Sequence, residues 1–191
     1  MTEDAIKTPF LKGHFIIAMP SLADTNFSHT VTCISEHTAE GAVGIVVNKV
    51  HRELKAEMIF KELDIDYTVG AEQIPIHIGG PVHNDELFVL HSTSWDWRGG
   101  LEINDNLALS NSRAILEAIA KQEGPSAYII SLGCAGWGPG QLEWELSQNA
   151  WLTAPCRPDI IFDLPIDTRW ETAIRQLGID PVLLSETAGH A

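Results

Sequence analysis

The stretch SLGCAGWGPGQLEWEL, from Ser131 to Leu146, gathers the residue types of this sequence that could do chemistry. It holds one cysteine, two tryptophans, two glutamates and four glycines within sixteen residues. Three uses are open: a nucleophilic Cys134, a loop whose backbone N–H groups bind an anion, or a tight turn from a strand into a helix. A nucleophile must reach its thiolate form, which a helix N-terminus or a neighbouring imidazolium would favour.

Cys134 lies a few residues before the expected helix, but the sequence places no histidine beside it. The histidines that could approach it in space are His37, His77, His83 and His91. Cys33 falls inside an apolar strand and is expected to be a small core residue. Cys156 follows a proline in a loop and is expected to be the most exposed thiol. We therefore predict no catalytic residue and assign Cys134 to packing.

The glycines of this stretch match neither the G-x-G-x-x-G fingerprint nor a phosphate loop. A strand, a glycine turn and a helix N-terminus could still offer free N–H groups to an anion. Glu143 and Glu145, in the first turns of the helix, already complement its positive end. The favoured interpretation is that the glycines allow close packing around Trp137, and that Gln141 and Glu143 cap their own helix.

Metal and hydrolase signatures are missing from the sequence. It has no H-x-x-x-H, no H-E-x-x-H, no cysteine pair at zinc spacing and no G-x-S-x-G elbow, so we predict no metal and no cofactor. His77 and His91 fall in strands on either side of a turn and could face one another. Glu36 and His37 are adjacent in a strand and point to opposite faces, which leaves one of them to anchor the turn before Gly41.

Polar side chains next to Gly and Pro recur at several expected strand ends, and we interpret them as one concave site for a ligand or partner. The site is predicted where the glycine-rich loop meets the Gly-Gly-Pro-Val turn. Its residues are Asn48, Gly79, Gly80, Pro81, His91, Gly136, Trp137, Gln141 and Glu143.

The elements that would position these residues follow from apolar patterning. Residues 42–48 and the strand before them are expected to form a hairpin at Gly41, and residues 74–80 and 86–92 to pair with each other. Further strands are expected at residues 14–20, 30–36, 126–133 and 151–155, with short strands around a turn at 104–106. Helices are expected at residues 56–63, 110–122, 140–150 and from about 168 to 177, while residues 159–165 are ambiguous. The mixture indicates an α+β fold.

Composition and net charge limit the classes of molecule that this protein is expected to bind. The 191 residues are 45 % hydrophobic and 20 % charged, which fits one soluble globular domain. The formal net charge of −14 makes nucleic acid an unlikely partner and disfavours an anionic membrane. The one basic concentration is interleaved with glutamates and is interpreted as a solvated helix and loop face: Lys49, Arg52, Lys55 and Lys61.

The N-terminal residues lack the basic start and apolar core of a secretory signal, and residues 1–12 are expected to form a flexible tail. No apolar run is long enough to span a bilayer. Three cysteines are too few and too scattered for a disulfide framework. We therefore expect a cytoplasmic protein with no membrane association.

The ordered segments from Gly13 to Gly178 resemble the AlgH/YqgE family of bacterial proteins. The matching stretches are GHFIIAMPSLADTNFSHTV, EHTAEGAVGIVVNK, IHIGGPV, FVLH, SLGCAGWGPGQLEWEL and NAWLTAP, followed by FDLP and RW. The resemblance implies that residues 1–191 form a single domain, with a bifurcated, mostly antiparallel sheet folded as a pseudo-barrel with flanking helices. Family members commonly carry tyrosine at the position of Cys134, so a role shared across the family does not depend on that thiol.

The leading functional hypothesis is a cytosolic, cofactor-free binding or regulatory protein of the AlgH/YqgE type, which contacts an unidentified protein or small-molecule ligand. One alternative is a hydrolase or thiol-dependent enzyme that uses the GWGPGQLEWE pocket. The other is the DNA-binding transcriptional regulator suggested by the family's label, against which the net charge argues. The sequence leaves the oligomeric state open.

Overall fold

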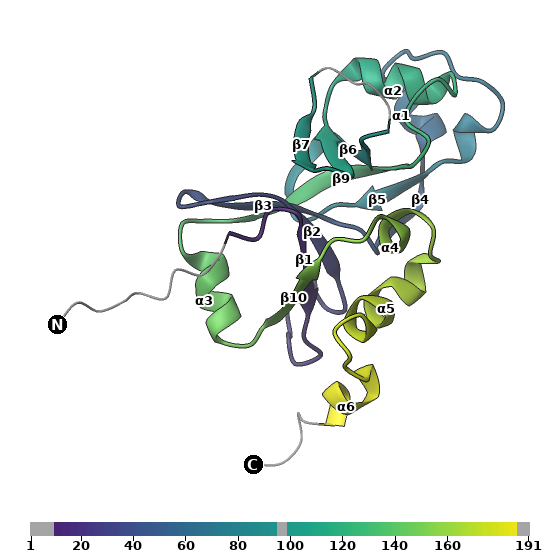
Figure 1. Ribbon diagram of the computed structural model, residues 1–191. Coiled ribbons are helices and arrows are strands. Elements are labelled where there is room, and N and C mark those ends of the chain that lie inside the picture. The colour runs from purple at the N-terminus through teal and green to yellow at the C-terminus, as the bar shows by residue number, and fades with distance from the viewer. Residues whose placement is uncertain (1–9, 95–98, 187–191) are drawn as a thin grey trace.

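The computed structural model describes residues 10–94 and 99–186, which form a mixed α+β fold built on one large sheet (Figure 1). The strands of the sheet are β1 (His14–Ala18), β2 (Val31–Thr38), β3 (Gly41–Val46), β4 (Val50–Lys55), β5 (Pro75–Ile78), β6 (Val82–Ser92), β7 (Leu101–Asn104), β8 (Leu107–Ser110), β9 (Tyr128–Trp137) and β10 (Trp151–Pro155). The α-helices are α1 (Ala56–Glu62), α2 (Arg113–Ala120), α3 (Gln141–Ser147), α4 (Pro158–Phe162), α5 (Arg169–Arg175) and α6 (Pro181–Glu186), with short 3₁₀ turns at Ala71–Gln73 and Ile166–Thr168.

The sheet branches at β9. Its main path runs β10-β1-β2-β3-β9-β6-β8-β7, while β5 pairs with β9 in parallel and carries β4 on its other side. The first part of β9 pairs with β5 and β6 at Ile130, and its last part pairs with β3, where Trp137 lies opposite Ala42. This arrangement is the bifurcated, mostly antiparallel sheet that the family resemblance implied.

The sheet is not closed into a barrel, unlike the pseudo-barrel that the resemblance implied. Within the described residues β10 pairs only with β1, and β7 pairs only with β8, so the path has two free ends. β5 joins as a third partner of β9 and carries β4, so part of the sheet leaves the main path at that strand.

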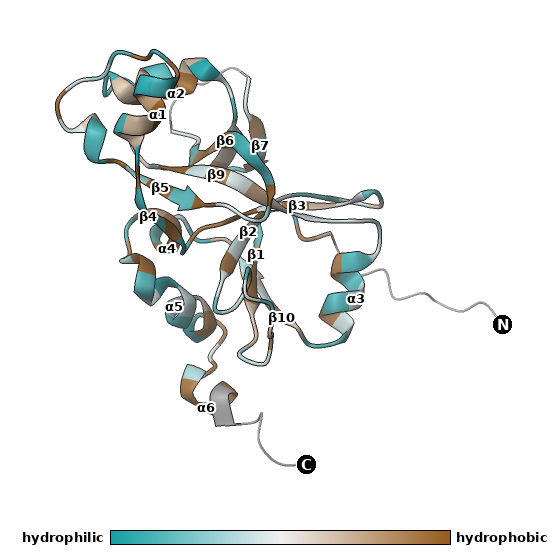
Figure 2. Ribbon diagram, turned by 180° about the vertical axis from the view of Figure 1, so that it is seen from behind, coloured by the Kyte–Doolittle hydropathy of each residue, from teal (hydrophilic) through white to brown (hydrophobic). Residues whose placement is uncertain are grey.

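Three hydrophobic cores lie on the faces of this branched sheet. In β1, Phe15 and Ile17 face α4 and α5, whereas Ile16 and Ala18 face α3, as the twofold periodicity of a strand requires. Figures 1 and 2 show α3 on one side of β1, β2 and β10 and α5 on the other. The third core is covered by α1 and α2 and is centred on Phe60.

The hairpin predicted at Gly41 is confirmed, because Thr38 and Gly41 are partners at the end of the β2–β3 ladder. The predicted pairing of residues 74–80 with 86–92 is wrong. Strand β9 lies between them, so that Ser131 has His77 on one side and Phe88 on the other. Because Phe88 and His91 are three positions apart on one strand, His77 and His91 point to opposite faces and do not meet.

The glycine-rich stretch is largely strand. β9 was predicted to end at Gly133 but continues to Trp137, because β3 and β6 supply backbone partners along its whole length. Only Gly138, Pro139 and Gly140 form the loop before α3.

Two elements have no counterpart among the predictions, β4 and α6. Residues 50–55, assigned from sequence to a helix and loop face, form β4, whose side chains do not alternate between buried and exposed. The ambiguous segment near residue 160 contains α4.

The expected tail at residues 1–12 falls mostly outside the described residues, which begin at Phe10. Leu11 is 5 % exposed and belongs to the core beneath α3. Among the helices described, none has the length and apolar content needed to cross a bilayer.

Candidate functional site

A cleft of about 550 Å³ lies between the loop that follows β1, the junction of β3 and β4, and the α5–α6 region. We call it the Trp170 cleft. It is lined by Pro20, Ser28, His29, Asn48, Lys49, Ile166, Asp167, Trp170, Glu171, Arg175, Pro181 and Val182.

An aromatic pair forms one wall of the Trp170 cleft. The rings of Trp170 and His29 have centroids 4.6 Å apart and are tilted by 54°. Trp170 is fixed from behind, because its Nε1–H donates to the Ala18 carbonyl at 3.0 Å. His29 adopts a left-handed backbone with φ of 55°, and its Nδ1 lies 3.0 Å from the Ser28 hydroxyl. The wall is therefore held in place by its own contacts.

Asn48 connects the loop that carries His29 to the sheet by hydrogen bonds. Its Oδ1 accepts the Val31 N–H and its Nδ2 donates to the His29 carbonyl, both at 2.8 Å. One side chain thus fixes the two ends of the turn that presents His29. Asn48 was predicted as a binding residue, and the geometry makes it a positioning residue at the cleft.

Arg169 anchors α5 at the same place. This buried guanidinium donates from Nε to the Leu164 carbonyl at 3.0 Å and from Nη1 to the Val47 carbonyl. Because Val47 precedes Asn48 and Arg169 precedes Trp170, the hydrogen bond to Val47 holds the two walls of the cleft together. No local pattern in the sequence predicts this contact, because it joins residues 122 positions apart.

Two charged groups of opposite sign remain unpaired in the Trp170 cleft. Lys49 donates from Nζ to the carbonyls of Asn26 at 2.9 Å and Thr25 at 3.3 Å. Burial lowers the pKa of Lys49, and the charge of Asp24 opposes that shift. Within the described residues neither Lys49 nor Asp167 has an ion-pair partner within 4 Å, whereas Glu171 and Arg175 pair with each other at 3.1 Å.

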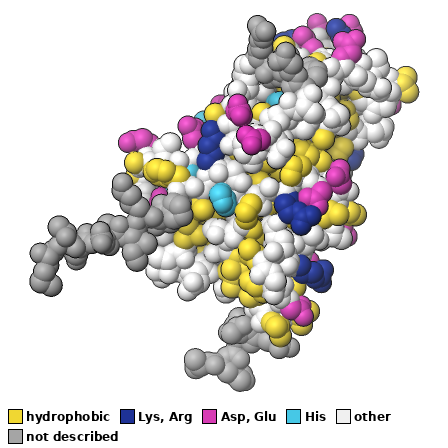
Figure 3. Space-filling view, viewed as in Figure 1, with side chains coloured by type: hydrophobic (Ala, Val, Ile, Leu, Met, Phe, Trp, Pro, Cys, Tyr) yellow, Lys and Arg dark blue, Asp and Glu magenta, His cyan; other side chains and the backbone are white. Residues whose placement is uncertain are grey.

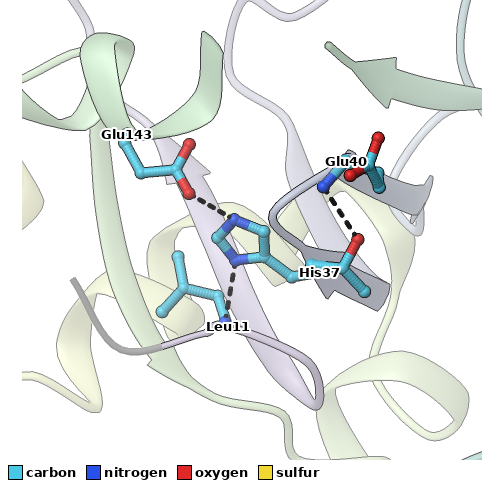
Figure 4. Close-up of polar contacts among 5 residues, drawn as sticks. Leu11, His37, Glu40 and Glu143 are labelled. Carbon is cyan, nitrogen blue, oxygen red and sulfur yellow. Dashed lines mark hydrogen bonds and ion pairs between the residues drawn. The ribbon is translucent and has the colours of Figure 1, made fainter. Parts of the chain in front are cut away.

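His37 of β2 and Glu143 of α3 form a second polar arrangement (Figure 4). Nδ1 of His37 accepts the Leu11 N–H at 2.9 Å, and its Nε2 lies 2.8 Å from Glu143 Oε1. Because a backbone N–H can only donate, the imidazole proton is assigned to Nε2, which then donates to Glu143.

Both nitrogens of His37 are therefore occupied, and its side chain is 1 % exposed. The group ties Leu11 to β2 and α3 and has no free lone pair to act as a base. Glu36, its neighbour, is exposed, as the alternation predicted. The prediction that Glu143 caps its own helix is wrong, because its carboxylate reaches across to His37 instead.

Glu145 organises the rest of the glycine-rich stretch. Its Oε2 accepts the indole N–H groups of Trp137 at 3.0 Å and Trp151 at 2.8 Å, and its Oε1 accepts from Gln141 at 3.0 Å. Gln141 in turn accepts the Gly138 N–H at 3.0 Å. This role of Glu145 was not predicted from the sequence, although buried indoles require an acceptor and Gln141 lies four residues before Glu145.

The predicted site residues do not share one pocket. Asn48 lines the Trp170 cleft, while Gly80 and Pro81 line a second pocket of about 230 Å³ with Asn26, Val46, Ile78 and Asn84. Trp137 lines a third pocket of about 380 Å³ beside the β2–β3 turn. His91 is buried, with its Nε2 at 3.0 Å from the Ser110 hydroxyl.

The structure does bring the Gly-Gly-Pro-Val turn against β9. A Cβ on Gly79 would lie 2.1 Å from the Gly133 carbonyl oxygen, and one on Gly80 would lie 2.3 Å from the Cys134 backbone. Gly136 is exposed, and a Cβ there would meet Val82 at an ordinary 3.4 Å. Among the glycines of the stretch, only Gly133 is closely packed, and it packs against the turn rather than around Trp137 as predicted. The glycine that closely approaches Trp137 is Gly41, where a Cβ would lie 2.2 Å from the Trp137 carbonyl oxygen.

The thiols are positioned for packing. Cys134 is 2 % exposed, and burial, with a smaller contribution from the charge of Glu86, raises its pKa to about 11. Cys33 is buried and lies 3.3 Å, sulfur to sulfur, from the half-buried Cys156. The described residues contain no cluster of three or more His, Cys, Asp or Glu that could hold a metal ion.

Basic side chains are dispersed on the face shown in Figure 3. Lys and Arg (dark blue) stand among Asp and Glu (magenta) and hydrophobic side chains (yellow), without a patch of positive charge. This distribution differs from the clustered lysines and arginines that typically bind nucleic acid.

Comparison with known proteins identifies the family. A family model described as AlgH-like matches residues 15–182. A UPF0301 protein of Desulforapulum autotrophicum is 48 % identical over 181 residues, which cover 95 % of this chain and 96 % of that protein. A UPF0301 protein of Pseudomonas fluorescens is also 48 % identical, over 188 residues, 97 % of this chain and 98 % of the relative.

Two solved structures share the fold. The solution structure of the AlgH protein from Pseudomonas aeruginosa is 44 % identical, covers all of both chains and superposes with a TM-score of 0.79. The crystal structure of protein DIP2367 from Corynebacterium diphtheriae, 21 % identical with a TM-score of 0.73 over 93 % of this chain and 92 % of that one, supports the fold alone. The chain belongs to the AlgH-like family.

Proposed function

We propose that this chain is a cytoplasmic, cofactor-free binding protein that takes a small ligand into the Trp170 cleft and acts in regulation through that binding. The observation that carries the proposal is the construction of the cleft. An aromatic wall and two unpaired charged groups surround about 550 Å³, within the range of small-molecule sites. The cytoplasmic location is supported by three free cysteines.

The enzymatic alternative in the glycine-rich stretch has less support. Cys134, with a pKa of about 11, stays protonated near neutral pH and is a poor nucleophile. His37 uses both ring nitrogens in hydrogen bonds. The DNA-binding alternative has less support as well, because the net charge is −14.

The test is a set of ¹H–¹⁵N spectra of the ¹⁵N-labelled protein recorded with defined mixtures of amino acids and short peptides, nucleotides, sugar phosphates and organic acids. The indole N–H signal of Trp170 is the reporter, because that group is held at the cleft wall by Ala18. We expect at least one mixture to shift this signal together with the amides of His29, Lys49 and Asp167. Shifts confined to other surfaces, or none with any mixture, would refute the proposal.

A further inference from the structure

We infer that the ligand of the Trp170 cleft is a small apolar zwitterion, with a free ammonium group, a free carboxylate and a hydrophobic body. This chemistry is shared by apolar amino acids and short apolar peptides. The inference rests on the proposed function and names the ligand class for the same cleft.

The Trp170 cleft holds a positive and a negative side chain that are separated from each other. Lys49 stands at the β3–β4 junction, and Asp167 stands in the turn before α5. Both line the cleft, yet they form no ion pair with each other. The cleft therefore keeps a positive and a negative group apart on different walls.

Lys49 is partly buried, whereas Asp167 is exposed, so Lys49 has the greater need of a partner of opposite charge. Its ammonium has lost part of its hydration, and the two contacts that replace it are neutral carbonyls. A ligand carboxylate would supply the charge-assisted hydrogen bond that the protein leaves unmade. The charge of Asp24 acts on Lys49 only from beyond ion-pair distance.

The other charges of the cleft disfavour a purely anionic ligand. Asp167 and Glu171 are exposed at the opposite wall, and Arg175 is already paired with Glu171. A phosphate or dicarboxylate that reached Lys49 would face the uncompensated carboxylate of Asp167. A ligand ammonium placed at Asp167 turns this repulsion into an attraction.

The rest of the lining accepts a hydrophobic body. The indole of Trp170 is half-buried, Pro181 is buried, and Pro20 and Ile166 are half-buried beside them. In an amino acid the aliphatic side chain branches from the carbon that carries both charged groups, and in a dipeptide the side chains lie between the charged termini. In either case the side chain would be removed from water against these groups. The ring of His29 extends the apolar wall next to Trp170.

The experiment measures binding of four probes by titration of the Trp170 indole signal: leucine, the dipeptide leucyl-leucine, N-acetyl-leucine, which lacks the ammonium, and leucinamide, which lacks the carboxylate. We expect leucine or the dipeptide to bind about tenfold or more tightly than either capped probe, since each cap removes one charge-assisted hydrogen bond. Binding by leucine would assign a free amino acid, and binding by the dipeptide alone would assign a short peptide.

Two variants connect each charge to its partner. Asp167→Asn should abolish the difference in affinity between leucine and N-acetyl-leucine. Lys49→Met should abolish the difference in affinity between leucine and leucinamide. Where only the dipeptide binds, its own capped forms replace these probes. The side chain of Asp167 is exposed and forms no ion pair in the described residues, so its substitution should leave the fold intact. Asp163→Asn, which makes the same change outside the cleft, is the control.

Capped probes that bind as tightly as the zwitterion would overturn the inference, as would variants that weaken all probes equally. If no amino acid or peptide shifts the signal but another class of compound does, the inference fails and the proposed function stands. If no compound of any class shifts it, the proposed function fails as well.

Discussion

At the scale of single residues, polar side chains that the sequence offers as candidates for catalysis or binding are used in hydrogen bonds that stabilise the fold. Glu145 serves two indoles and an amide, and His37 joins a backbone N–H to Glu143. Residue type alone therefore misleads about function in this chain, because a buried donor that is satisfied stabilises the protein and has nothing left to offer a ligand. By contrast, the charges of Lys49 and Asp167 have no ion-pair partner within the described residues.

His77 is a buried residue with a measurable consequence for stability. Within the described residues neither ring nitrogen has a hydrogen-bond partner, and burial, assisted by the charge of Arg169, lowers its pKa from 6.5 to about 4. Between these values the unfolded chain binds a proton that the native state does not, so the free energy of unfolding falls as pH falls from 6.5 to 4. The loss attributable to His77 is about 3 kcal/mol.

Urea unfolding of the wild type and His77→Leu at pH 4, 5, 6 and 7 checks this prediction. The variant should lose less stability on acidification, because it has no imidazole to protonate when it unfolds. His51→Leu, which removes the imidazole of a partly exposed histidine in β4, is the matched control. Parallel stability curves for the wild type and His77→Leu would show that burial of His77 has no such effect.

At the scale of elements, the contact of the Gly-Gly-Pro-Val turn with β9 explains why two glycines occur there. We expect Gly79→Ala to destabilise the protein by on the order of 3 kcal/mol, because the added Cβ would lie 2.1 Å from the Gly133 carbonyl oxygen. Gly136→Ala, in β9, where the added Cβ would meet Val82 at an ordinary 3.4 Å, should change the free energy of unfolding by less than about 0.5 kcal/mol. Thermal and urea unfolding measure both, and equal effects would contradict the packing argument.

Sequence patterning predicted elements well where the chain is locally periodic. The β2–β3 hairpin, the short strands around Asn104 and helix α2 follow from local apolar spacing and turn residues. Strand β4 was missed because VHRELK carries no alternating apolar face. The pairing of β5 with β9 was missed because it joins segments more than fifty residues apart, and no local signal reports such a contact.

The candidate site was less predictable for the same reason. Asn48 was selected from sequence, but the Trp170 cleft also needs His29 and Asp167, which only tertiary packing brings near it. Lys49, the next residue after Asn48, was assigned from sequence to a solvated face. The family resemblance supplied the fold and not the site. The glycine-rich stretch was proposed as part of a site because of its residue types, but its polar groups form hydrogen bonds with each other.

At the scale of the whole molecule, net charge and its distribution govern what can approach. A charge of −14 repels nucleic acid at long range, and the face in Figure 3 offers no basic patch to overcome it. A zwitterion carries no net charge and does not experience this barrier. The acidic surface is therefore compatible with the proposed ligand class and selects against polyanions.

We propose that strand β9 makes the described residues one cooperative unit, as a single domain would be. Ile129 and Cys134 belong to the core under α4 and α5, Ile130 to the core under α1 and α2, and Trp137 to the core under α3. No core can open without disturbing the strand that the other two share. We predict that Gly79→Ala lowers the exchange free energy of the slowest amides in β1 and in β6 by the same amount, measured by native-state hydrogen exchange. A decrease confined to β6 and its neighbours would instead divide the chain into two independently unfolding parts.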